Sequence, residues 1–143
     1  MISGFGHVNL GVSDIDKMVE FYTDVIGLTK AFELKNDEGN VFGVYMLLPD
    51  GNYIEFIKRA KVQEPPVSAF TAGHLCFEVE DINKAKEIID GKGIEIIWGG
   101  MKLGKDKNWQ IFINDPENNK IELMQMDPES PQRLGQAKMG FVK

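Results

Sequence analysis

The sequence of 143 residues contains little of what would assign it to several common protein classes. Its single cysteine cannot form an internal disulfide, which favours a reducing, cytoplasmic location. No apolar run is long enough to span a bilayer, and the start has no basic segment followed by an apolar stretch, so we expect neither a membrane partner nor a signal peptide. The net charge of −6 leaves no basic stripe to neutralise phosphates, which argues against a nucleic-acid partner.

Histidine is also scarce, and an internal repeat accounts for both copies. His7 and His74 open similar segments that lie 67 residues apart, and Glu55 and Glu122 close similar segments at the same offset of 67. Each half of the chain therefore carries one His near its start and one Glu near its end. The matching segments are Gly6–Val12 with Gly73–Val79, and Pro49–Glu55 with Pro116–Glu122.

Each copy is predicted to form one strand, one helix and three further strands. The first strand alternates apolar and polar residues, and apolar residues follow at helical spacing. Between them lies an acidic helix N-cap signal, Ser13–Asp14 in the first copy and Glu80–Asp81 in the second. The apolar helix stripes are Ile15, Met18, Val19, Tyr22, Val25 and Ile26 in the first copy, and Ile82, Ala85, Ile88 and Ile89 in the second. Later strands are expected at 29–34, 42–48 and 52–58, and at 95–99, 109–114 and 120–126, with a basic, glycine-rich loop at 99–107.

The predicted fold class is α+β, with two tandem βαβββ modules in a single domain of residues 1–143. The modules span about residues 5–58 and 73–126, with a linker at 59–72 and a polar tail at 127–143. One such unit cannot bury its sheet alone. We therefore expect the strands to form a curved, open, barrel-like mixed sheet with the helices on its convex face.

Strand alternation predicts that both His and both Glu side chains point into the concave face. If Leu10 and Val12 face the helices, His7 faces the other way, and the same parity holds for His74 and for the two Glu in the closing strands. Two nitrogen and two carboxylate donors then predict one metal site. The alternative is a duplicated fold whose polar pairs only hydrogen-bond to each other.

This mixed donor set suits one divalent ion, such as Ni, Zn, Co, Mn or Fe, and the lack of a Cys pair argues against a closed structural zinc site. Four protein ligands on an octahedral ion leave two positions for two adjacent oxygens of one substrate. The ion would then stabilise an enediolate formed by proton loss beside a carbonyl, and a Glu ligand that loosens would act as the base.

The residues also resemble a known family. The two modules with their Gly-His starts, the segments Phe21–Tyr22 and Gly27–Leu28, and the run Asp115–Leu123 resemble the vicinal oxygen chelate superfamily over about residues 5–126. That superfamily includes glyoxalase I, methylmalonyl-CoA epimerase, extradiol dioxygenases, fosfomycin-resistance enzymes and bleomycin-binding proteins. The resemblance implies a homodimer whose sites lie within one chain or are shared between two chains.

Within the superfamily the ligand pattern most resembles glyoxalase I, whose His, Glu, His, Glu set corresponds to His7, Glu55, His74 and Glu122. The epimerase typically has Gln where Glu55 stands, the fosfomycin and extradiol enzymes have no carboxylate ligand there, and the antibiotic-binding proteins lack the metal set. The resemblance implies methylglyoxal detoxification, in which a methylglyoxal–thiol hemithioacetal becomes a 2-hydroxyacyl thioester. Glu122 would be the mobile base and Glu55 its counterpart.

Two positions depart from bacterial glyoxalase I, which usually has Arg where Gly11 stands and Asn where Arg59 stands. Both departures fall on glutathione recognition, so the thiol or the substrate can differ. The further candidates for substrate binding are Asn9 and Cys76, two residues after each His, and Lys102 and Lys105 of the basic loop. A small apolar filler is the alternative for Cys76, and a solvated loop is the alternative for the lysines.

Other functions on the same fold stay open at this point. They are an epimerase, a sugar-acid or lactone isomerase, a thiol transferase, and a non-catalytic protein that binds a small molecule. A Lewis-acid donor set has no use in a pocket that only sequesters its ligand, which counts against the last of these.

Overall fold

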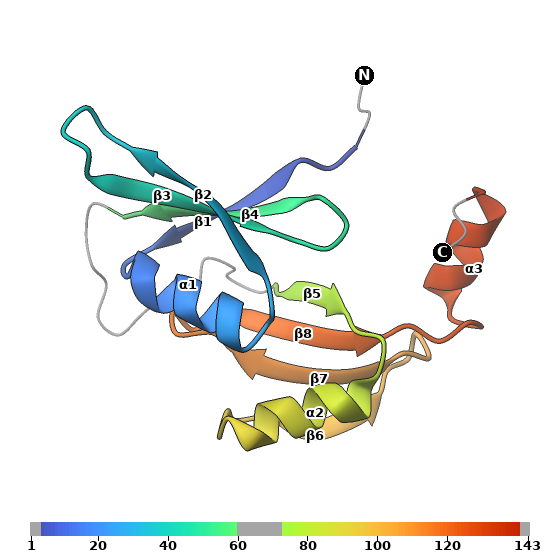
Figure 1. The fold of residues 1–143 in the computed structure, drawn as a ribbon. Coiled ribbons are helices and arrows are strands. Elements are labelled where there is room, and N and C mark those ends of the chain that lie inside the picture. Colours follow the sequence, from blue (N-terminus) through green and yellow to red (C-terminus); the bar gives the residue numbers. More distant parts are fainter. Residues whose placement is uncertain (1–3, 60–72, 141–143) are drawn as a thin grey trace. The chain divides into compact units, whose positions relative to one another are not determined.

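The computed structural model describes residues 4–59 and 73–140, and the chain divides into two compact units (Figure 1). The first unit comprises Met1–Thr71 together with the turn Asp115–Asn118, and the second comprises Ala72–Asn114 together with Asn119–Lys143. The order of elements confirms two βαβββ modules and the α+β fold class. The predicted linker, 59–72, falls outside the described residues except for Arg59.

The first module forms a mixed, open sheet of four strands. Its elements are β1 (His7–Val12), α1 (Ile15–Asp24), β2 (Thr29–Lys35), β3 (Val41–Leu47) and β4 (Tyr53–Lys58). The strand order is β1-β4-β3-β2, in which β1 and β4 are parallel and the other neighbours are antiparallel.

The second module repeats this topology. Its elements are β5 (Leu75–Glu78), α2 (Ile82–Gly91), β6 (Ile97–Leu103), β7 (Trp109–Asn114) and β8 (Lys120–Gln125). The strand order is β5-β8-β7-β6, again with the first pair parallel. Each module thus builds its own open sheet, and the first and last strands of each module are neighbours.

Each helix covers one face of its own sheet. The N-caps fall within the two predicted signals, at Asp14 and Asp81, whose carboxylates accept hydrogen bonds from backbone N–H groups of the first turn. Met18 and Tyr22 of α1 are fully buried, and the Tyr22 ring meets the Phe56 ring of β4 edge-on, with centroids 5.0 Å apart. The predicted parity of the first strand is therefore confirmed, because Leu10 and Val12 are buried while His7 is exposed on the opposite face.

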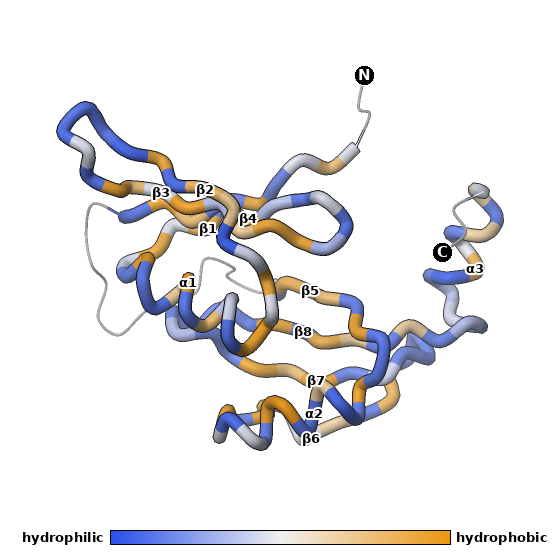
Figure 2. The backbone as a smooth tube through the Cα atoms, in the orientation of Figure 1, coloured by the Kyte–Doolittle hydropathy of each residue, from blue (hydrophilic) through white to orange (hydrophobic). Residues whose placement is uncertain are grey.

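The second helix is less completely covered than its apolar stripe suggested. Figure 2 shows hydrophobic residues between hydrophilic ones along α2, and Ile82 and Ile89 are buried. Ile88, which was predicted to belong to the apolar stripe, is 51% exposed. The buried residues of α2 lie seven positions apart, on one narrow face, and Ile88 lies outside it.

The sequence prediction was wrong for β6. A strand was expected at 95–99 and a loop at 99–107, but β6 runs over Ile97–Leu103 and only Gly104–Asn108 forms the turn. Trp98, Gly99 and Gly100 all have positive φ, and the register with β7 shifts between Ile97 and Lys102. The consecutive glycines form an irregularity inside the strand rather than its end.

The segment predicted as a polar tail contains a helix. This helix, α3 (Pro131–Lys138), begins at the N-cap Ser130, and Arg133 makes an ion pair with Glu78 at 2.7 Å. Asn108 is fully buried and donates hydrogen bonds to Asp106 and Gln132.

Among the described residues, no helix is long and apolar enough to cross a membrane.

Candidate metal centre

In the first module the strand pairing brings His7 and Glu55 together. Both side chains lie on the sheet face opposite α1, and His7 Nε2 is 3.5 Å from Glu55 Oε2. Asn9 Nδ2 donates a hydrogen bond of 2.6 Å to the same carboxylate oxygen. The Tyr45 hydroxyl also donates to Glu55, and this hydrogen bond, followed by desolvation and the carboxylate charge, raises the pKa of Tyr45. The Tyr45 ring meets the His7 imidazole edge-on, with centroids 5.6 Å apart.

The second module holds the equivalent pair more tightly. His74 Nε2 is 2.7 Å from Glu122 Oε2, and the Glu122 side chain is only 7% exposed. The Phe112 ring stands edge-on to the imidazole at 5.4 Å. Cys76 is exposed as a residue, but loss of water around its sulfur, together with the charge and hydrogen bond of Glu122, raises the pKa of the thiol to about 12.

The two pairs sit in the same row of each sheet. In both modules the Glu has a cross-strand neighbour on each side: the residue two positions after the His, and an aromatic residue. The corresponding neighbours in the two modules are again 67 residues apart. The two rows are Asn9–Glu55–Tyr45 and Cys76–Glu122–Phe112. The internal repeat thus extends from the sequence to the geometry around each carboxylate.

The rows differ in how firmly they hold the carboxylate. Glu55 accepts from an amide and a phenol, whereas the positions beside Glu122 offer a ring without a polar atom and a thiol, which is a weak donor. Among the described residues, Glu122 therefore has fewer strong donors than Glu55, apart from His74.

Arg59 and Gly11, the two departures from glyoxalase I, are in contact. A Cβ atom on Gly11 would lie 3.0 Å from Arg59 Nε and 3.3 Å from its Cγ, so the arginine stem occupies the space that a side chain at position 11 would need. Gly11 lies on the same face of β1 as His7 and Asn9. A guanidinium from the end of β4 thus reaches the strand where glyoxalase I usually carries an arginine of its own.

The two predicted lysines are placed differently. Lys102 lies in β6 rather than in a loop, and its Nζ is 5.4 Å from the centre of the Phe112 ring. Lys105 is exposed in the turn after β6, and its side chain makes no hydrogen bond or ion pair among residues 4–59 and 73–140. Lys120 is not among the predicted binding residues, and its Nζ lies 5.6 Å from the centre of the Trp98 ring. Lys120 stands at the repeat offset from Tyr53, which pairs with His7 in the first module, but the two residue types differ, so the repeat does not mark it.

Aromatic rings border the first pair. Phe32 stacks on Tyr45 at 4.5 Å, and Tyr53 meets both rings edge-on. Phe32 is 46% exposed, so these three rings do not simply pack in the core.

Within the part of the chain that the structure describes, no group of three or more His, Cys, Asp or Glu side chains could hold a metal ion. Each module by itself offers one imidazole and one carboxylate.

The sequence profile of the Glyoxalase/Bleomycin resistance protein/Dioxygenase superfamily matches residues 4–123. The chain belongs to this superfamily. Its solved members include a fosfomycin resistance protein whose structure holds Mn(II), so the superfamily includes proteins that bind a divalent metal.

Curated relatives in the superfamily carry different names. Lactoylglutathione lyase of Schizosaccharomyces pombe is 29% identical over 87% of this chain, which spans only 48% of that protein. Virulence protein STM3117 of Salmonella typhimurium is 30% identical, with 87% of this chain and 85% of the relative covered. Metallothiol transferase FosB of Staphylococcus haemolyticus is 27% identical, with 86% and 84% covered.

Solved structures in the superfamily have the same fold. The structure of STM3117 matches with a TM-score of 0.66 at 26% identity, covering 89% of this chain and 99% of that one. FosX of Listeria monocytogenes, crystallised with Mn(II) and 1S,2S-dihydroxypropylphosphonic acid, matches with a TM-score of 0.69 at 22% identity, covering 94% and 99%. At such identities the agreement lies in the tandem βαβββ architecture.

Proposed function

We propose that this chain is a metal-dependent lyase or isomerase of the glyoxalase I type. Its substrate carries two adjacent oxygens, and the reaction turns a methylglyoxal–thiol hemithioacetal into a 2-hydroxyacyl thioester. The observation that carries the proposal is the His–Glu pair on the same face of the sheet in both modules. Relatives named lactoylglutathione lyase support it at 28–29% identity.

The proposed metal ligands are His7, Glu55, His74 and Glu122, and together they hold one divalent ion: Ni, Zn, Co, Mn or Fe. The donor atoms fit such an ion because imidazole nitrogens and carboxylate oxygens are its usual ligands, and each pair has already converged within its module. When bound, the ion supplies Lewis-acid stabilisation of the negative charge that develops on a substrate oxygen.

Glu122 is the proposed base, and Glu55 is its counterpart that keeps its position. The Glu122 carboxylate takes the proton from the carbon that bears the sulfur and returns it to the adjacent carbonyl carbon, so the isomerisation needs no oxidant or reductant. A base that carries a proton between two carbons has to reorient slightly. Among the described residues only His74 is a strong donor to Glu122, whereas Asn9 and Tyr45 both hold Glu55.

The residues proposed to bind the remainder of the substrate lie around these pairs. They are Asn9, Arg59, Cys76, Lys102 and Lys105. Arg59 is the strongest of them in the first module, because its stem lies against Gly11 on the face that carries His7. Lys105 has the weakest support, since its exposed turn is also what a solvated loop would show.

The decisive assay supplies the methylglyoxal–glutathione hemithioacetal to protein loaded in turn with Ni, Zn, Co, Mn or Fe, and follows thioester formation. Adducts of bacillithiol and coenzyme A extend the assay to other thiols. We expect turnover with at least one ion and one thiol. Metal binding without turnover on any of these adducts would exclude the glyoxalase reaction.

Single variants test the assigned roles. Glu122→Gln is expected to lower kcat by about 100-fold or more, as for loss of a general base, and Glu55→Gln is expected to weaken metal binding more than kcat. Glu129→Gln, in the exposed turn before α3, is the matched control and should change neither value. Full activity of Glu122→Gln would refute its role as the base.

A metallothiol transferase is the second candidate, because the relatives named FosB are 26–27% identical over most of both chains. By resemblance, fosfomycin enzymes have no carboxylate ligand at the position of Glu55. Loss of free thiol in the presence of fosfomycin would therefore favour this candidate, and Glu55→Gln would leave that activity largely intact. We rank three other functions below this candidate because no observation favours them. They are an epimerase, a sugar-acid or lactone isomerase, and a non-catalytic binding protein.

A cytoplasmic location and a homodimer belong to the same proposal. The single cysteine supports the first, and the resemblance to glyoxalase I supports the second. Sedimentation of the metal-loaded protein measures the oligomeric state.

A further inference from the structure

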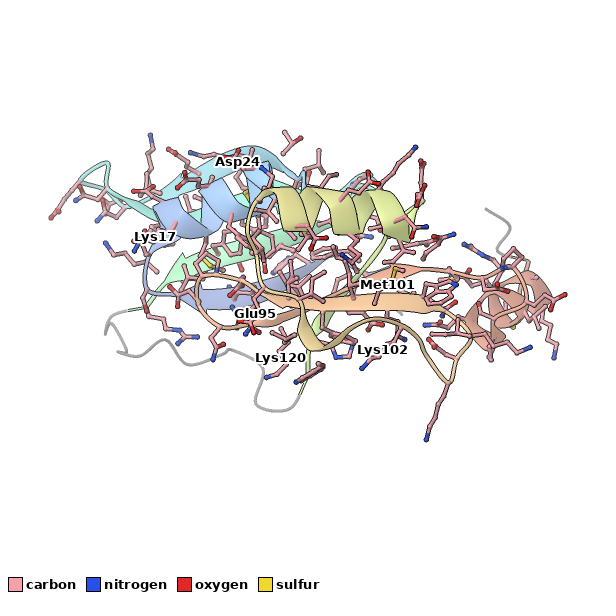
Figure 3. All side chains as sticks on the ribbon, turned by 90° about the horizontal axis from the view of Figure 1, so that it is seen from below. Lys17, Asp24, Glu95, Met101, Lys102 and Lys120 are labelled. Atoms are coloured by element: carbon pink, nitrogen blue, oxygen red, sulfur yellow. The ribbon has the colours of Figure 1, made fainter. Side chains whose placement is uncertain are left out.

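Two lysines of the second module lie on the sheet face that carries His74 and Glu122. Lys120 precedes Glu122 by two positions in β8, so the two side chains share a face. Lys102 reaches the same face from β6, since its Nζ lies over the Phe112 ring that borders His74. In Figure 3 Lys102 and Lys120 lie on the side of the second sheet away from α2.

Both ammonium groups rest on a pair of touching rings. Trp98 and Phe112 have centroids 4.9 Å apart, Lys120 Nζ is 5.6 Å from the Trp98 ring, and Lys102 Nζ is 5.4 Å from the Phe112 ring. These distances fall within cation–π range, which limits the freedom of two otherwise flexible side chains. Lys102 also donates a hydrogen bond to the Trp98 carbonyl at 3.4 Å.

The backbone is strained at Trp98, one of the two rings under the lysines. Trp98 has φ 59°, an unusual value for a bulky side chain, and Gly99 and Gly100 follow with φ 89° and 85°. The result is a tryptophan that stays 53% exposed beside Phe112 rather than joining the core. Such strain persists where the surroundings require it and is common at ligand sites.

The two lysines have no acidic partner among the described residues. Across residues 4–59 and 73–140, neither ammonium forms an ion pair. Lys35, which occupies the position of Lys102 in the first module, is paired with Glu33 at 3.2 Å. In a chain with a net charge of −6, two cations on one sheet face with no ion-pair partner among the described residues form an electrostatic feature of their own.

We propose that Lys102 and Lys120, held over Phe112 and Trp98, bind an oxyanion group of the substrate beside the His74–Glu122 pair. The shared chemistry is a compact carboxylate or phosphonate, which two ammonium groups bind through charge-assisted hydrogen bonds. This inference rests on the proposed function for its reacting centre, and it assigns an anionic substrate group to the second module.

Fluorescence of Trp98 provides the test. In a Trp109→Phe background, which leaves Trp98 as the only indole, acetate and methylphosphonate are titrated at constant ionic strength, with acetamide as the uncharged probe. We expect a saturable change with at least one oxyanion and none with acetamide. Which oxyanion binds more tightly distinguishes a carboxylate substrate from a phosphonate substrate.

Variants then assign the effect to the lysines. Lys102→Met and Lys120→Met keep the apolar stem and are each expected to raise the Kd about tenfold or more, whereas Lys84→Met on α2 removes the same charge elsewhere and should leave it unchanged. Lys120→Arg keeps the charge and serves as the second variant if the Met change disturbs folding. Equal affinity in all variants, or an unsaturable response, would overturn the proposal.

Metal content separates this proposal from the metal chemistry. The Lys variants should retain as much bound metal as the unaltered protein, whereas His74→Ala should lose metal and still show the oxyanion response. Loss of metal binding in Lys120→Arg would contradict a substrate role for this lysine.

Discussion

Tyr22 of α1 is completely buried, and its hydroxyl donates a hydrogen bond of 3.1 Å to Asp115 Oδ2 within the first unit. Burial, then the Asp115 charge, then this hydrogen bond raise the Tyr22 pKa well above its ordinary value of 10.0. The folded state therefore keeps a proton that the unfolded chain releases.

The pH dependence of stability follows from this shift. Because the folded pKa is the higher one, the contribution of Tyr22 is complete below pH 10.0 and is lost as the pH rises above that value. We expect the free energy of unfolding to fall by about 1.4 kcal/mol per pH unit there. Tyr22→Phe should be less stable at neutral pH by about 1 kcal/mol and should lack most of this alkaline slope. Urea unfolding at several pH values measures both, and parallel slopes would contradict the assignment.

Gly11 and Arg59 provide a second prediction at the level of single residues. A methyl group on Gly11 would come within 3.0 Å of Arg59 Nε, so Gly11→Ala forces the arginine stem to move. In Arg59→Ala the same change meets no such obstacle. A double-mutant cycle on stability should give a coupling of about 0.5–1 kcal/mol. Strict additivity would mean that the two positions are independent.

At the scale of single elements, the start of helix α1 depends on one buried carboxylate. Helix α1 begins where Ser13 and Asp14 donate backbone hydrogen bonds of 2.5 and 2.9 Å to Glu117 Oε1, and Glu117 is only 4% exposed. A carboxylate at a helix N-terminus also interacts favourably with the helix dipole. The turn Asp115–Asn118 thus belongs to the first unit although its sequence lies between β7 and β8.

Removal of that carboxylate should loosen the start of α1. Glu117→Ala leaves two backbone N–H groups without their acceptor, and we expect a loss of about 2–3 kcal/mol in the free energy of unfolding. Glu87→Ala, on the exposed face of α2, is the control and should change stability by less than about 0.5 kcal/mol. Hydrogen exchange should show faster opening of the first turn of α1 in the Glu117 variant only.

The irregular strand β6 is the other element with a testable backbone. Gly99 has φ 89°, a conformation that an L side chain rarely adopts, so Gly99→Ala should destabilise the protein by about 1–2 kcal/mol and shift the Trp98 emission. Gly91→Ala, at the end of α2 with no atom close to its new methyl group, is the matched control and should be neutral or slightly stabilising. Thermal unfolding compares the two, and equal losses would argue against strain at Gly99.

For the whole molecule, the proposed metal site predicts a stoichiometry. Each chain supplies two His–Glu pairs, and a site uses two, so one ion per chain is expected whether a site lies within one chain or is shared by two. His7→Ala and His74→Ala should each abolish tight binding. Added metal should then no longer raise the unfolding temperature, whereas for the unaltered protein an excess of about 100 Kd stabilises by about 2.7 kcal/mol.

Mixing these two inactive variants distinguishes the two arrangements. If sites are shared, a mixed dimer contains one site with an intact His7 from one chain and an intact His74 from the other, and part of the activity returns. If each chain holds its own site, both sites lack one ligand and no activity returns. Co-refolding of the two variants, with each alone as the control, measures this directly.

Much of the candidate site was predictable because the duplication marks it. The constant offset identified His7, Glu55, His74 and Glu122, and strand alternation placed each pair on the face opposite its helix. The offset does not mark Lys120, because Tyr53 stands at the equivalent position, and the glycines at 99 and 100 predict a loop where the structure has a strand. Gly-Gly weakens a strand prediction locally, whereas pairing with β7 on both sides of the irregularity keeps β6 in the sheet.

The sequence by itself determined the element order, the two helix N-caps and the His–Glu pairs, since these depend on local periodicity and on a repeat that is visible in the letters. Only the tertiary structure decided that Asn9 and Tyr45 hold Glu55, that Arg59 lies against Gly11, and that Lys102 and Lys120 rest on adjacent rings. These contacts join side chains from different strands. Their formation depends on cross-strand register and on a strained bulge, which long-range packing sets and no local pattern records.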